Sequence, residues 1–112
     1  MNFTVINHTD YSIISSEEAK LNSLNASELK ATILTLNKEN ISHLIIDLSK
    51  TTYCDSSGLS ALLSANRLCK NSNGKFILTG LQPNVKKMIE IAQLHRVLSI
   101  TETLEEAEKG MQ

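Results

Sequence analysis

The chain has 112 residues, 41% of them hydrophobic and 21% charged, and its formal net charge is −1. This length suits a single domain, residues 1–112, with one core. The near-neutral charge and only four aromatic residues argue against a nucleic-acid-binding surface. No apolar run approaches the roughly 20 residues needed to cross a bilayer, and no basic region precedes an apolar run as in a secretory signal. We therefore expect a cytoplasmic protein without membrane insertion, whose Cys54 and Cys69 are free, buried thiols.

The N-terminal part of the chain predicts a β-hairpin. Residues 2–7 and 11–15 are rich in strand-forming side chains, and the polar residues 8–10 between them suit a turn. Residues 16–20 are polar and predict no regular element.

The first helix is predicted to follow Asn25. Asn25 suits the capping position, and Glu28 stands where a capping box places its acid. The helix ends near residues 40–42. Its apolar positions recur at helical spacing and predict one buried stripe: Ala26, Leu29, Ile33 and Leu36.

The middle of the chain predicts a strand, a helix and a second strand. Residues 43–48 are too apolar for a half-exposed strand, which favours a central strand covered on both faces. Residues 55–70 have helical periodicity and stop at 71–74, where Gly74 is free to adopt a positive φ. The next strand covers residues 75–80. This order suits a right-handed parallel crossover unit.

The C-terminal part predicts two further helices separated by a strand. Pro83 suits the first position of a third helix, residues 97–100 form a short strand, and Thr103 with Glu106 forms a capping box for a final helix. The fold class is therefore α/β, with a mixed sheet of four to five strands flanked by about four helices.

The sequence contains no recognisable catalytic motif. The nucleophile elbow G-x-S-x-G lacks its first glycine around Ser56, and nothing in the sequence brings His8, His43 or His95 to this serine. The glycines are not clustered as in a phosphate-binding loop, and no His, Asp or Glu cluster has metal-ligand spacing. We expect no enzyme activity, no cofactor and no metal site.

The stretch Asp55–Gly58, which opens the second helix, has two possible roles. Asp55 and the serines suit a helix cap, which stabilises by about 1 kcal/mol. The alternative is a phosphoacceptor, because a phosphate at a helix N-terminus meets free amides and the positive end of the dipole. Two other helix starts carry an acid at the third position, where this one has Gly58. Gly58 is predicted to leave the amides uncovered and to let another molecule approach; the residues alone favour the cap and leave the switch open.

Two segments resemble a known family. The apolar strand Leu44–Leu48, followed by Tyr53–Leu59 with the sequence Tyr-Cys-Asp-Ser-Ser-Gly-Leu, resembles the signature of the STAS domain, shared by bacterial anti-sigma factor antagonists and sulfate-transporter tails. Residues 21–26, 73–78 and 83–85 also resemble family segments. The resemblance covers nearly the whole chain and implies a mixed sheet flanked by helices.

The resemblance implies that Ser56 is a phosphoacceptor. The partners it implies are an anti-sigma factor that is also a serine protein kinase, which binds the unphosphorylated form, and a metal-dependent serine phosphatase. Asn22 stands where many antagonists carry an aspartate; it keeps the hydrogen bonding and loses the charge. The expected partner-binding and switch surface comprises Asn22, Asn25, Thr51, Thr52, Asp55, Ser56, Ser57 and Gly58.

Two other functions are compatible with the sequence. The chain could be a non-switching STAS subunit of a transporter or sensory complex, with Ser56 only a cap. An enzyme or small-ligand sensor would need a deep pocket between the second and third helices.

Overall fold

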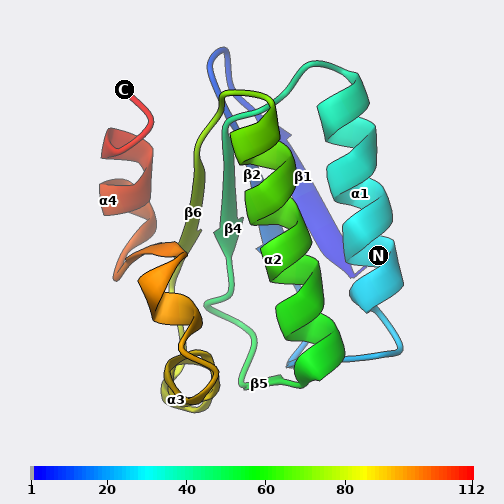
Figure 1. Ribbon diagram of the computed structural model, residues 1–112, viewed down its shortest axis with the longest axis vertical. Coiled ribbons are helices and arrows are strands. Elements are labelled where there is room, and N and C mark those ends of the chain that lie inside the picture. The colour runs from blue at the N-terminus through cyan, green and yellow to red at the C-terminus, as the bar shows by residue number, and fades with distance from the viewer. Residues whose placement is uncertain (1) are drawn as a thin grey trace.

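The computed structural model describes residues 2–112. Five strands form one mixed sheet in the order β1-β2-β4-β6-β7 (Figure 1). The β1–β2 pair is antiparallel and every other pair is parallel. The strands are β1 (Phe3–Asn7), β2 (Ser12–Ser16), β4 (Leu44–Asp47), β6 (Phe76–Thr79) and β7 (Ser99–Thr101).

Four α-helices flank the sheet, and the predicted α/β class and element order are confirmed. Helices α1 and α2 lie side by side on one face (Figure 1). A short 3₁₀ turn, η1 (Leu94–Arg96), follows α3 and was not predicted. The helices are α1 (Ala26–Lys38), α2 (Ser56–Asn71), α3 (Pro83–Ile91) and α4 (Leu104–Lys109).

The central strand β4 shows why the sheet is covered on both faces. Successive side chains of a strand point to opposite faces, so Leu44 and Ile46 join the large core beneath α1, α2 and α3, whereas Ile45 joins a smaller cluster beneath α4. All three are at most 2% exposed. The prediction of a strand buried on both faces is confirmed.

A second, two-stranded sheet lies near the start of α2. Strand β3 (Lys20–Leu21) pairs in parallel with β5 (Tyr53–Cys54), with Leu21 opposite Cys54. Sequence reasoning missed this pair, because two-residue strands have no readable periodicity. It fixes the loop before α1 against the loop before α2.

Two predicted helix ends differ from the structure. Asn25 precedes α1, but its side chain makes no capping bond and Glu28 instead accepts a hydrogen bond from Asn2 Nδ2 (2.7 Å). After α2, the positive φ belongs to Asn73. Gly74 is needed for space, since a Cβ there would lie 1.8 Å from the Ser42 carbonyl oxygen. The capping box at Thr103 and Glu106 is confirmed.

Candidate functional site

Helix α2 begins at Ser56 and is capped by Asp55. The Asp55 Oδ1 atom accepts a hydrogen bond from the Gly58 amide (3.0 Å). The Asp55 amide donates to the Leu21 carbonyl oxygen (3.1 Å), which ties the cap to β3. The cap interpretation is confirmed for Asp55, and it leaves the serines that follow available for another role.

Gly58 does not play the role expected from the sequence. Its amide is covered by Asp55, and the residue is buried. A Cβ on Gly58 would lie 2.6 Å from Cys54 Sγ and 2.6 Å from the Leu21 carbonyl oxygen. The missing side chain therefore lets β3 and β5 approach α2 within the molecule, and it does not open the helix end to another molecule.

Ser56 is exposed at the first position of α2, whereas Ser57 is half-buried. Within residues 2–112, no hydrogen bond is found to the amide of either serine. Ser56 borders a hollow of about 290 Å³ between the starts of α1 and α2. No acidic side chain lines it: its residues are Ser23, Ala26, Ser27, Lys30, Ser56, Ser57 and Ser60.

Lys30 brings a positive charge into this hollow (the Ser56 hollow). Its Nζ lies 3.4 Å from the Oγ of Ser60, one helical turn after Ser56. Sequence reasoning missed Lys30, Ser27 and Ser60. A signal existed, because Ser27 and Lys30, like Ser56 and Ser60, are polar pairs at helical spacing. Only the pairing of α1 with α2 shows that the two pairs face each other.

The loop before α1 is held by its two asparagines. The Asn22 Oδ1 accepts from the Leu24 amide (3.0 Å), so this side chain forms a local turn. Asn25 is 7% exposed; its Oδ1 accepts from the Asn22 amide and its Nδ2 donates to the Lys20 carbonyl oxygen. Asn25 thus shapes the loop from inside, while Leu24 beside it is 90% exposed.

The two threonines before β5 lie differently from each other. Thr51 is fully buried, with its Oγ1 2.8 Å from both the Ser16 Oγ and the Glu18 carbonyl oxygen. Thr52 is exposed. Thr51, Asn25 and Gly58 were expected on the partner-binding surface; their burial corrects this, because in this conformation they support the surface from beneath. The exposed or half-buried members are Asn22, Thr52, Asp55, Ser56 and Ser57.

Both cysteines are free and buried, as predicted. Burial raises the pKa of the Cys54 thiol to about 12, with the nearby Asp55 carboxylate adding to the effect. Burial raises the pKa of Cys69 to about 11. Thiolates are the reactive form, so neither thiol suits nucleophilic or redox chemistry.

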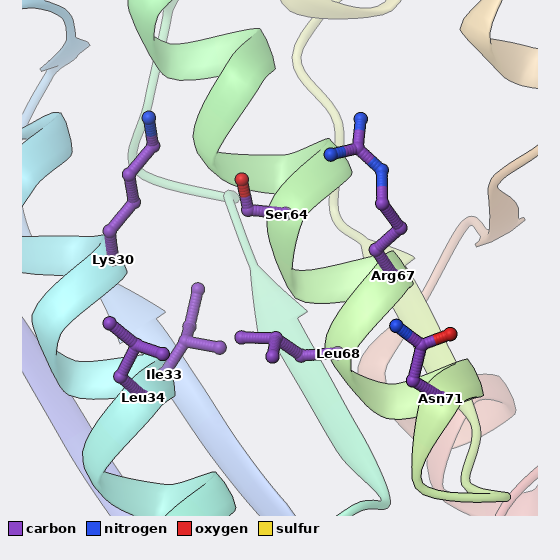
Figure 2. Close-up of a pocket in the computed structure, with 7 residues that line it drawn as sticks. All are labelled: Lys30, Ile33, Leu34, Ser64, Arg67, Leu68 and Asn71. Atoms are coloured by element: carbon purple, nitrogen blue, oxygen red, sulfur yellow. The ribbon is translucent and has the colours of Figure 1, made fainter.

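Neither a metal-binding cluster nor a membrane-spanning helix is found in residues 2–112. This part of the chain holds no group of three or more His, Cys, Asp or Glu side chains that could bind a metal ion. It also holds no helix that is both long and apolar enough to cross a membrane. A separate groove lies between α1 and α2 (Figure 2), whereas an enzyme or small-ligand sensor would need a deep pocket between α2 and α3.

Comparison with known proteins places this geometry in a family. The STAS domain model matches residues 4–107. A Bordetella bronchiseptica protein assigned as an anti-sigma factor antagonist, BtrV, is 24% identical over 98 residues, covering 88% of this chain and 84% of that protein.

Two solved structures share the fold. A Planctomyces limnophilus anti-sigma-factor antagonist (STAS) domain protein has a TM-score of 0.88 at 19% identity and covers 97% of each chain. The Bacillus cell fate determinant SpoIIAA in its phosphorylated form has a TM-score of 0.76 at 21% identity, covering 98% of this chain and 99% of that one. With its family match spanning most of the sequence, the chain belongs to the STAS domain family.

Proposed function

We propose that this protein is an anti-sigma factor antagonist whose binding to its partner is switched off by phosphorylation of Ser56. The partner is an anti-sigma factor that is also a serine kinase, and a metal-dependent phosphatase reverses the modification. The protein acts in the cytoplasm by binding and is not itself an enzyme. The observation that carries this proposal is the exposure of Ser56 at the start of a helix that Asp55 already caps.

The surroundings of Ser56 favour a phosphate without loss of the fold. Phosphorylation adds about −1.5 to −2 charges. The positive end of the α2 dipole and the Lys30 ammonium in the same hollow both attract that charge. Because the Ser56 side chain makes no hydrogen bond within residues 2–112, its modification leaves the cap and the core in place.

The phosphate is expected to weaken partner binding at the docking surface. The unphosphorylated surface is formed by Ser56, Thr52 and the 22–24 loop, and the Asp55 carboxylate stands directly before Ser56. A dianion beside Asp55 repels an acidic partner surface and must be desolvated by an apolar one. A loss of about 3 kcal/mol in binding lowers affinity by roughly two decades, since each 1.4 kcal/mol is tenfold.

The proposal is tested with the candidate anti-sigma kinase from the same organism, ATP and three proteins: wild type, Ser56→Ala and Ser57→Ala. The Ser57 variant is the matched control, because it removes the neighbouring hydroxyl. We expect one phosphate on wild type and on Ser57→Ala, and none on Ser56→Ala. Phosphorylated protein and Ser56→Asp are expected to lose binding in calorimetry.

Two outcomes would contradict the proposal. Phosphorylation of Ser56→Ala to the wild-type level would place the acceptor elsewhere. Full binding by phosphorylated protein would leave Ser56 as part of a cap only, as in a scaffold subunit of a transporter complex.

A further inference from the structure

The groove between α1 and α2 shares Lys30 with the Ser56 hollow, and its Ile33 and Leu68 also pack in or against the core. Its volume is about 310 Å³, at the lower end of the range for small-molecule sites. Leu34 is 47% exposed there, which leaves a large apolar side chain in contact with water. The lining residues are Lys30, Ile33, Leu34, Ser64, Arg67, Leu68 and Asn71.

The charges in this groove are all positive. Lys30 and Arg67 contribute two cations, and no Asp or Glu lines the groove. Neither residue belongs to an ion pair formed within residues 2–112. Because the whole chain has a formal net charge of −1, this local excess of cations is not a consequence of composition.

Charged and aliphatic side chains occupy different parts of the groove. Figure 2 shows the Lys30 ammonium and the Arg67 guanidinium at one end, with the Ser64 hydroxyl between them. Further along α1 and α2 lie the side chains of Ile33, Leu34 and Leu68, with the Asn71 amide beyond them on α2. The groove thus has a cationic end with a hydroxyl donor and an aliphatic part.

We propose that the α1–α2 groove binds a small aliphatic carboxylate of the medium-chain fatty-acid type. The carboxylate lies between Lys30 and Arg67, where a guanidinium can bind it in a bidentate manner, and Ser64 donates a hydrogen bond. The alkyl chain covers Leu34 and Leu68. A free phosphate would leave the aliphatic part empty, and a neutral lipid would leave both cations unpaired. Lys30 also lines the Ser56 hollow, so a phosphate on Ser56 would compete for its charge, whereas Ser64 and Arg67 line the groove and not that hollow.

The test is a titration of the ¹⁵N-labelled full chain, followed by amide chemical shifts. Decanoate is added below its micelle concentration; decylammonium carries the same chain with the opposite charge, and butyrate carries the same carboxylate with a short chain. We expect saturable shifts at residues 30–34 and 64–71 with decanoate, and weaker binding of both controls.

Variants separate the two parts of the groove. Arg67→Glu reverses a charge at an exposed site and is expected to weaken decanoate binding about fivefold. Leu34→Gln keeps a helix-forming residue and is expected to weaken binding by a similar factor. Lys86→Glu, on the exposed surface of α3, makes the same charge change away from the groove and should leave binding unchanged. Circular dichroism checks that each variant is folded.

Three results would overturn the proposal. Equal binding of decylammonium would show that charge is not recognised. Decanoate shifts at another surface, for example around the exposed Ile91 and Val97, would place the site elsewhere. A leucine- and glutamate-rich helical peptide that shifts residues 30–34 and 64–71 when decanoate does not would assign the groove to a protein partner.

Discussion

Gly58→Ala is the substitution that tests the packing beneath the switch most sharply. Gly58 lies inside α2, where alanine is a better helix former by about 1 kcal/mol. A surface helix would therefore gain stability from this change. Here the new methyl group would lie 2.6 Å from both Cys54 Sγ and the Leu21 carbonyl oxygen, and 2.9 Å from Leu21 Cγ.

The clash is expected to outweigh the helix propensity. Two of the three contacts involve a backbone carbonyl and a buried thiol, neither of which can swing away as the end of a flexible side chain can. Overpacking a core costs about 1–3 kcal/mol, and the upper half of this range applies to rigid neighbours. After subtraction of the propensity gain, we expect Gly58→Ala to lower the free energy of unfolding by about 1–2 kcal/mol.

The assay is urea denaturation followed by circular dichroism, with Ser60→Ala as the control. Ser60 is exposed on the same helix, so its replacement should leave stability unchanged or slightly raised. Cys54→Ala removes one of the clashing atoms, and the double variant should lose less than the sum of the two single variants. A Gly58→Ala protein as stable as wild type would refute the role assigned to Gly58.

Two further predictions concern the cap and the thiols. Asp55→Ala removes the acceptor for the Gly58 amide and is expected to lower stability by about 1 kcal/mol, whereas Asp55→Asn, which keeps an oxygen acceptor, should lower it much less in the same urea assay. The pKa values of about 12 for Cys54 and about 11 for Cys69 lie well above pH 8. Almost no thiolate is therefore present in native protein at pH 8, and we expect negligible reaction with a thiol reagent. Two thiols per chain should react in denaturant; rapid native labelling would contradict this burial.

The sequence predicted the sheet and the four helices because their apolar residues follow clear periods. Residues 43–48 and the stripe of α1 are examples. Short elements without a period, such as β3 and β5, could not be predicted. The Asn25–Glu28 pair has the spacing of a capping box, but other contacts replace the capping bonds. Asn25 donates to the Lys20 carbonyl oxygen, and Glu28 accepts a hydrogen bond from Asn2.

The sequence predicts which residues flank Ser56 in the chain, but it does not predict which of their side chains are buried. Asp55 was identified as a cap because its chemistry is local. The inward role of Gly58 depends on the pairing of β3 with β5, and Thr51 is buried against Ser16 and the Glu18 carbonyl oxygen. The sequence reveals neither contact. Lys30 was missed because it lies 26 residues before Ser56 in the chain, and only the packing of α1 against α2 brings it to the same hollow.

The central claim is that Ser56 is a phosphorylation switch. It is tested most directly by site-resolved mass spectrometry of this protein isolated from its native cells under several growth conditions, with each sample divided into partner-bound and free fractions. We expect phosphate on Ser56 in the free fraction and unmodified Ser56 in the bound fraction. Phosphate confined to another residue, or equal Ser56 phosphorylation in both fractions, would contradict it.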